Sequence, residues 1–195
     1  TNNIVFDGHH ENAPFNVTLD NVNMGATPKN HNQAPGSSGV DTPTGGQITI
    51  KALQSSIKKV TLVLKGENQV RNITYYNAGD TSTPQTVDSY LKITDINGDG
   101  AVGDGVDGGS LYIPYKIETE AEIEAFVATK TNYNHWNAGI GGIDSQSLVQ
   151  NLHIAGGKIQ VVTTLGDNCT AIGAGGNGYC EMLISGGEVI AHCNG

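Results

Sequence analysis

Charged side chains are scarce in this chain of 195 residues: Asp, Glu, Lys and Arg together make up 15%, against about 25% in an average globular protein. Aromatic residues contribute only 6%, so a core has to be built mainly from Ile, Val and Leu. Ten basic residues stand against nineteen acidic ones, giving a net charge of −9, which argues against a nucleic-acid partner because phosphates need a basic surface. No apolar run approaches the ~18–20 residues that span a bilayer, so we expect no membrane insertion.

Several enzyme and metal-site motifs are also missing. The three cysteines, Cys169, Cys180 and Cys193, form no CxxC pair, which argues against a zinc site. One disulfide with a free thiol and three buried thiols both remain open. The chain has no GK[ST] phosphate loop and no order of Ser, His and Asp that indicates a hydrolase. We therefore assign no catalytic residue and expect a protein that is not an enzyme.

Glycine is abundant, with 27 residues, and it separates short runs of β-type sequence. Within most of these runs apolar and polar residues alternate, which is typical of strands with one buried and one solvated face. This pattern predicts an all-β fold. The expected strands are Asn3–Phe6, Phe15–Val22, Gln47–Ala52, Val60–Lys65, Asn72–Tyr76, Tyr90–Thr94, Ser110–Tyr115, Leu152–Val162 and Glu181–His192.

One segment, roughly residues 120–130, is predicted to be a helix. Thr119 followed three residues later by Glu122 forms a capping box. Behind it, Ile123, Phe126 and Val127 make a short apolar stripe. We expect this helix to lie on the sheet or to close one end of it, as a packing element.

The C-terminal third contains an internal repeat with an offset of 30 residues. The segment Leu152–Ile159 aligns with Met182–Val189, and each copy holds two strands separated by a Gly-Gly pair. Ahead of each copy stands a further similar stretch, since Asn137–Gly142 resembles Thr170–Gly176. Repeats of this length point to a solenoid, and with strands as the repeating element the simplest solution is a parallel β-helix. We expect a single domain over residues 1–195, with an insertion at about 95–134 that holds a calcium loop and the helix.

The repeat is interrupted at the end of the sequence. His192-Cys193-Asn194-Gly195 occupies the place that His135-Trp136-Asn137-Ala138 holds in an earlier repeat, and an Ala-Gly-Ile-Gly stretch would be expected next. An open solenoid end exposes strand edges and apolar surface. We therefore expect either that the chain is a fragment of a longer protein or that another chain covers this end.

The N-terminal half adds to this pattern with Phe15–Asn23, Gly46–Lys51 and Val60–Asn68 in succession. Together with the later Gly-rich units, these segments resemble the right-handed β-helix repeat regions of large bacterial surface proteins. They are also similar to the calcium-dependent, polysaccharide-binding β-helix domains of clostridial, cellulosome-type organisms. The resemblance covers most of residues 3–94 and 135–195. It implies a right-handed parallel β-helix that is secreted or displayed on the cell surface.

A candidate calcium loop begins at Asp95. Oxygen ligands at positions 1, 3 and 5, a Gly at position 6 and a backbone carbonyl at position 7 are what a calcium loop needs. The pattern resembles the dockerin loop, but position 12 is Val106 where an acidic ligand is expected. We expect a structural calcium ion, although a plain Asx-rich turn is the alternative reading. The candidate ligands are Asp95, Asn97, Asp99, Ala101, Asp104 and Asp107.

Residues 133–137 are the stretch most typical of a sugar-binding site. Aromatic rings stack on the apolar faces of pyranoses, and amides bind their hydroxyl groups. Packing between the helix and the sheet is the alternative role for these side chains. The candidate ligand-binding residues are Tyr133, His135, Trp136 and Asn137.

These observations favour a non-catalytic extracellular domain for adhesion or glycan binding, with calcium as a structural cofactor and a polysaccharide or cell-surface glycan as partner. A stalk, filament or surface-layer subunit that assembles end to end with neighbouring solenoid subunits is a second reading. A polysaccharide lyase is a third, because lyases combine this fold with calcium and a basic proton abstractor. Lys92, Lys65 and Arg71 would be its candidate bases.

Overall fold

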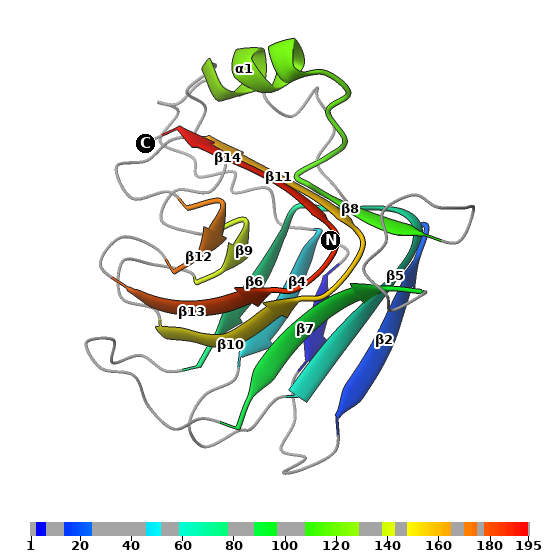
Figure 1. The fold of residues 1–195 in the computed structure, drawn as a ribbon, viewed down its shortest axis with the longest axis vertical. Coiled ribbons are helices and arrows are strands. Elements are labelled where there is room, and N and C mark those ends of the chain that lie inside the picture. Colours follow the sequence, from blue (N-terminus) through cyan, green and yellow to red (C-terminus); the bar gives the residue numbers. More distant parts are fainter. Residues whose placement is uncertain are drawn as a thin grey trace.

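The computed structural model describes residues 3–6, 14–24, 46–51, 59–77, 88–96, 108–128, 138–142, 148–164, 170–174 and 178–194 (Figure 1). Within these ranges the chain is mostly β, with one helix, which confirms the all-β class. The strands are β1 (Ile4–Phe6), β2 (Phe15–Asp20), β3 (Asn23–Met24), β4 (Gln47–Lys51), β5 (Lys59–Val70), β6 (Asn72–Tyr76), β7 (Tyr90–Asp95), β8 (Gly109–Ile113), β9 (Ile140–Gly141), β10 (Leu148–Ile154), β11 (Lys158–Thr164), β12 (Ile172–Gly173), β13 (Tyr179–Ile184) and β14 (Glu188–Asn194), and the helix is α1 (Glu120–Ala128).

All strand pairs among the described residues are parallel, and they form three ladders. Ladder A runs β1-β4-β6-β9-β12. Ladder B runs β2-β5-β7-β10-β13. Ladder C runs β3-β5-β8-β11-β14. The long strand β5 belongs to ladders B and C and joins them into one curled sheet (Figure 1).

Inward-facing side chains of the same kind stack along each ladder. In ladder A one column consists of isoleucine alone, since register pairs each member with the next: Ile4, Ile48, Ile73, Ile140 and Ile172. The three central members are fully buried. Branched side chains stacked on a pleated surface bury apolar area with little loss of rotamer freedom. The column therefore forms one wall of the core.

Ladder B contributes two further apolar columns. One contains Phe15, Val60, Leu91, Leu152 and Met182, and the other Val17, Leu62, Ile93, Ile154 and Ile184. Their central members are fully buried. The residues between these columns point outward because side chains alternate along a strand, and they are partly exposed or exposed. The alternation seen in the sequence is thus confirmed for this ladder.

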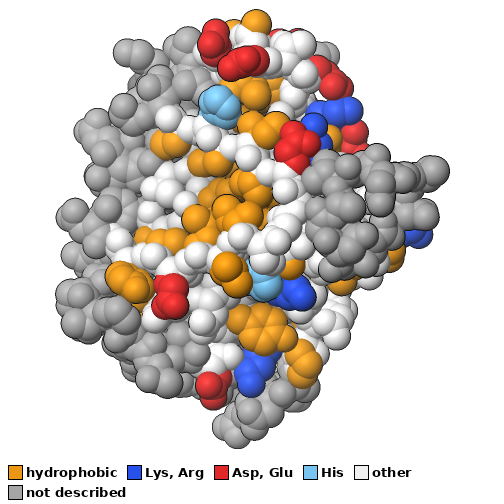
Figure 2. All heavy atoms as spheres, in the orientation of Figure 1, with side chains coloured by type: hydrophobic (Ala, Val, Ile, Leu, Met, Phe, Trp, Pro, Cys, Tyr) orange, Lys and Arg blue, Asp and Glu red, His pale blue; other side chains and the backbone are white. Residues whose placement is uncertain are grey.

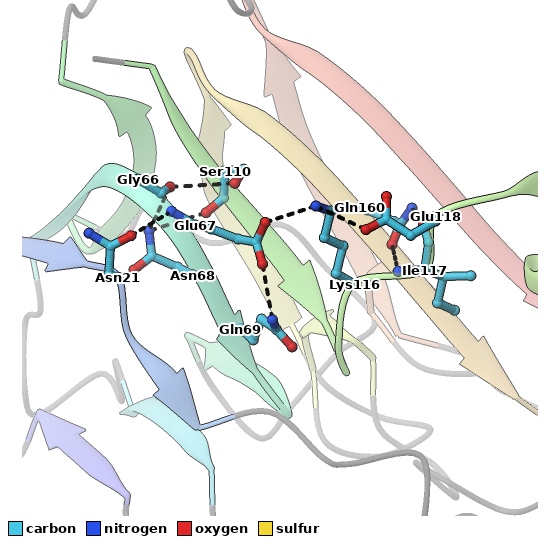
Figure 3. Close-up of polar contacts among 10 residues, drawn as sticks. All are labelled: Asn21, Gly66, Glu67, Asn68, Gln69, Ser110, Lys116, Ile117, Glu118 and Gln160. Carbon is cyan, nitrogen blue, oxygen red and sulfur yellow. Dashed lines mark hydrogen bonds and ion pairs between the residues drawn. The ribbon is translucent and has the colours of Figure 1, made fainter. Parts of the chain in front are cut away.

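Strand β5 turns from ladder B into ladder C at Gly66. The φ of Gly66 is +62°, a left-handed conformation, and a Cβ there would meet the side chain of Asn21. Next to it, the fully buried Asn68 accepts a hydrogen bond from the Val22 amide and donates to the carbonyls of Lys65 and Ser110. Figure 3 shows this amide between the strands. Asn68 thus fastens the bend to the strands on both sides of it.

The capping box predicted for the helix is present. The Thr119 amide donates to a Glu122 carboxylate oxygen at 3.1 Å, and the Glu122 amide donates to the Thr119 hydroxyl at 3.2 Å. Ile123 and Phe126 are buried in a small cluster with Ile117 and Val162, so α1 packs against β11 and β14. The helix lies on the outside of ladder C (Figure 1).

The 30-residue repeat is confirmed by register. Leu152 pairs with Met182 and Lys158 with Glu188, so the two copies lie directly on one another. Gly157 and Gly187 have φ of +84° and +83°. A Cβ on Gly187 would come within 2.4 Å of the Gly157 carbonyl oxygen. The Gly-Gly pair is therefore needed both for the conformation and for the close approach of successive corners.

The structure corrects three boundaries. The run Leu152–Val162 extends further in both directions, to Leu148 and Thr164, and comprises β10 and β11, divided at the Gly-Gly corner that the repeat predicts. The run Glu181–His192 is divided in the same way into β13 and β14. The strand predicted over Val60–Lys65 continues to Val70, because Gly66 bends it without ending its hydrogen bonding.

Candidate functional site

An open groove of about 800 Å³ lies on the outer face of ladder B. Its floor follows from the parallel register, which places Thr61, Lys92, His153 and Leu183 in one outward-facing row across β5, β7, β10 and β13. The groove is lined by Thr61, Tyr90, Lys92, Asn151, Leu152, His153, Glu181, Met182 and Leu183. We call it the ladder B groove.

An irregularity in β10 shapes the groove beside Tyr90. The register between β10 and β13 shifts between Val149 and Leu152, and Asn151 has a φ of +56°. The Asn151 side-chain amide donates to the Ser89 carbonyl at 3.1 Å, next to Tyr90 at the start of β7. A bulge of this kind re-aims side chains locally. It brings an amide and an aromatic ring together on one exposed surface.

Two basic groups lie side by side in the groove. Burial, and secondly the charge of Lys92, lower the pKa of His153 from its ordinary value. One ring nitrogen of His153, Nε2, lies 2.7 Å from the Ser185 hydroxyl. Among the described residues no carboxylate lies within 4.0 Å of the Lys92 ammonium. The Lys92 ammonium places a charged hydrogen-bond donor in the lining of the groove.

The acidic group of the groove is Glu181. Its carboxylate accepts a hydrogen bond of 3.4 Å from the Gln150 side-chain amide. The groove thus combines an aromatic ring, hydrogen-bond donors of both neutral and charged type, and one carboxylate acceptor. Such a set can stack against one face of a pyranose and bind its hydroxyl groups from the side.

A second hollow, of about 310 Å³, lies between the segment before α1 and strands β11 and β14. Lys116 at this hollow is already paired, since its ammonium lies 2.9 Å from Glu67 and 3.1 Å from Glu118 (Figure 3). These carboxylates, Glu67 first, raise the pKa of Lys116. The Gln160 side chain is held by two hydrogen bonds to the backbone of Ile117. We therefore regard this hollow as part of the packing that attaches the segment before α1 to β11.

Most residues proposed from the sequence lie outside the part of the chain that the structure describes. Of the calcium loop only Asp95 is described, while Asn97, Asp99, Ala101, Asp104 and Asp107 are not. The proposed sugar-binding residues, all within 133–137, also lie outside the described ranges. The structure therefore brings none of these sets together, and both sites stay predictions.

Asp95 ends β7 with a side chain that is 1% exposed. It stacks on Leu64 in the inward direction, and a Cβ on Gly156 would come within 2.7 Å of its Oδ1 atom. A buried carboxylate is chemically suited to be the first ligand of a cation. Within the described ranges, no three His, Cys, Asp or Glu side chains form a group that could hold a metal ion.

The cysteines resolve one alternative that the sequence left open. Cys193 in β14 is disulfide-bonded, while Cys180 in β13 is free and exposed. The arrangement is therefore one disulfide with a free thiol. Although the residue as a whole is exposed, its sulfur lies close to Gly173 of β12, and desolvation there raises the thiol pKa, which favours the protonated, less reactive form.

The ladder B groove was not predicted from the sequence. A signal for it exists, since an apolar-x-apolar triplet recurs as Phe15-Asn16-Val17, Val60-Thr61-Leu62, Leu91-Lys92-Ile93, Leu152-His153-Ile154 and Met182-Leu183-Ile184. Aligning these triplets places their central residues in one outward row. Only the last two triplets are related by the 30-residue repeat.

Comparison of the chain with protein-family models, curated proteins and solved structures finds no match. In the described part of the chain no helix has the length and apolar character needed to cross a membrane.

Proposed function

We propose that this chain is a right-handed parallel β-helix that binds an extended glycan in the ladder B groove, without catalysing its conversion, on the outside of the cell. The β-helix is supported by the order in which the chain visits the ladders, which is A, B, C in each of five successive passes. Right-handed crossovers between parallel strands are strongly favoured by strand twist.

The observation that carries the binding function is the side-chain content of the ladder B groove. Tyr90 offers a ring, Lys92 and Asn151 offer donors, and Glu181 offers an acceptor, all around one open hollow of about 800 Å³. Neighbouring strands are about 4.8 Å apart, so the row of Thr61, Lys92 and His153 spans about 10 Å, close to the length of a disaccharide. An extended sugar chain could follow this row across the strands.

The extracellular location is supported by the disulfide at Cys193. Disulfides persist in oxidising compartments and are rare in the cytosol. The resemblance to bacterial surface proteins points the same way. We further propose that calcium binds the loop that starts at Asp95, where it would neutralise clustered carboxylates and fix the loop between β7 and β8.

Affinity electrophoresis in gels containing single polysaccharides tests the binding function. We expect retardation by at least one glycan, and Tyr90→Ala should abolish it because the stacking ring is lost. Tyr76→Ala is the matched control, since it removes a tyrosine of β6 that does not line the groove. Absence of retardation by every glycan tested would overturn the proposal. Formation of ultraviolet-absorbing unsaturated products from pectin would replace it with a lyase.

A further inference from the structure

Both ends of the stack of strands are open in the described part of the chain. At one end β1, β2 and β3 each pair on one side only, and at the other end the same holds for β12, β13 and β14. Directly after β13, the Ser185 backbone amide donates to the Ile154 carbonyl of β10. Backbone groups alternate in direction along a strand, so the amide and carbonyl of Ile184 point away from β10. Unpaired edges of this kind are templates for further parallel strands.

The inner side of the last strands is also uncovered. Met182 and Ile184 are 41% and 48% exposed, whereas Leu152 and Ile154, the residues beneath them in the same columns, are fully buried. Ile172, Ala174 and Val189 on the neighbouring strands are only partly buried. Figure 2 shows hydrophobic side chains gathered on this face, in the region of β13 and β14. Core-type side chains therefore form an exposed surface at this end.

We propose that this end binds the β1-β2-β3 end of a second copy of the same chain, so that all three ladders continue from one copy into the next. Such a head-to-tail contact joins two different surfaces and leaves one of each free. It therefore generates an open filament of copies.

The register of the ladders specifies which residues meet. Continuing the columns places Ile4 of the second copy on Ile172, Phe15 on Met182, and Val17 on Ile184. Each of these junctions is apolar against apolar, as within the chain, and Ile4, Phe15 and Val17 are themselves only partly buried. The isoleucine column of ladder A would continue without a change of residue type.

The charges at the two ends are compatible with this contact. In the continued register Glu181 would face Pro14 of the second copy, and Glu188 would face Asn21, both uncharged. Asp20 is paired with Lys65 of its own chain at 3.0 Å. No like charges would thus meet among the described residues, which matters because buried like-charge contacts oppose association strongly.

Sedimentation velocity over a series of protein concentrations tests the contact. We expect species larger than the monomer to grow with concentration. Ile184→Lys should remove them, because the inward-facing ammonium would be buried without a partner against Val17 of the second copy. Leu183→Lys is the matched control: Leu183 is 56% exposed on the same strand but faces outward into the groove. Association should persist in that variant. A monomer at every concentration would overturn the proposal.

Disulfide trapping tests the register and the identity of the partner. In a Cys180→Ser background, the pair Ile184→Cys and Val17→Cys should give a ladder of covalent multimers on mild oxidation, because facing residues on adjacent strands are about 4.8 Å apart. The pair Ile184→Cys and Thr18→Cys should give none, since Thr18 faces outward. Covalent dimers from Ile184→Cys alone would instead indicate a tail-to-tail contact and overturn the head-to-tail arrangement.

Discussion

The hydroxyl group of Tyr75 donates a 2.6 Å hydrogen bond to the carbonyl of Gln150, a residue 75 positions away in the sequence. The same oxygen lies 3.2 Å from the Ser89 carbonyl and accepts a 3.0 Å hydrogen bond from the Asn77 side-chain amide. The side-chain oxygen of Asn77 in turn accepts a 2.7 Å hydrogen bond from the backbone amide of Gln150. One buried phenol therefore connects the end of β6 with the start of β7 and with β10.

Replacing Tyr75 by Phe should destabilise the protein. The substitution keeps the ring but removes the hydroxyl, which takes a partner from each of these buried polar groups, and the expected loss in unfolding free energy is about 1–3 kcal/mol. Urea denaturation followed by circular dichroism measures it. Tyr76→Phe, on the neighbouring and less buried tyrosine, should change the midpoint by much less. Equal midpoints for both variants would contradict the connecting role of Tyr75.

The Thr119→Ala variant should weaken α1. It removes the hydroxyl that accepts from the Glu122 amide, at a cost of about 1 kcal/mol. Hydrogen exchange of the first-turn amides should accelerate, while amides in ladder A should keep their protection. Thr119→Ser retains the hydroxyl and serves as control. If serine and alanine accelerate exchange equally, the capping box does not stabilise the helix.

Removal of the disulfide should lower stability more than removal of the free thiol. Cys193→Ser is expected to cost about 2–4 kcal/mol because the unfolded chain loses a constraint. Cys180→Ser changes an exposed thiol and should leave the melting temperature almost unchanged. Thermal denaturation without reductant compares the two. A similar small effect of both substitutions would show that the disulfide adds no stability.

The stability of the protein should depend on pH through His153. Burial and the nearby Lys92 lower its pKa in the folded state, so the unfolded chain binds a proton more readily. The associated stability is present above the unfolded value of about 6.5 and is lost as the pH falls from there toward the lowered pKa. His153→Gln should flatten the dependence of the melting temperature on pH between pH 7.5 and 5. An unchanged slope in His153→Gln would contradict this assignment.

Chelation should lower the melting temperature if calcium occupies the loop after Asp95, because the clustered carboxylates then repel one another. Asp99→Asn should reduce the difference between calcium and EDTA, since it removes a proposed ligand charge. Asp88→Asn is the control, as it alters an exposed aspartate before β7. A melting temperature that is the same with calcium and with EDTA would leave the loop as a plain turn.

The local features of the fold were predictable from the sequence, whereas most of its long-range stacking was not. The exception is the 30-residue repeat, which predicts that β13 and β14 stack on β10 and β11. Thr119 and Glu122 identify the helix start, and the Gly-Gly pairs identify the corners, because both are contained in a few neighbouring residues. Ile73 and Ile140 stack directly although 67 residues separate them. No fixed period reveals such a pair, since the segments between strands differ in length from one pass to the next.

The groove was harder to predict for the same reason. Lys92 and His153 become neighbours only through the pairing of β7 with β10, 61 residues apart. The bulge at Asn151 has no short sequence signature of its own. By contrast, Tyr133, His135 and Trp136 attract notice because they are close together in the sequence, which is a weak guide when strands far apart along the chain form one surface.

The isoleucine column of ladder A has a consequence for how such a chain can change. Ile48 and Ile73 lie 25 positions apart in the sequence, and Ile73 and Ile140 lie 67 positions apart. In both cases the two isoleucines pair directly with each other across adjacent strands. The stacking of the isoleucines thus depends on where each strand pairs and not on the length of chain between the strands. New segments can therefore be inserted at the connections, by evolution or by engineering, while the wall of isoleucines continues to specify where each strand belongs.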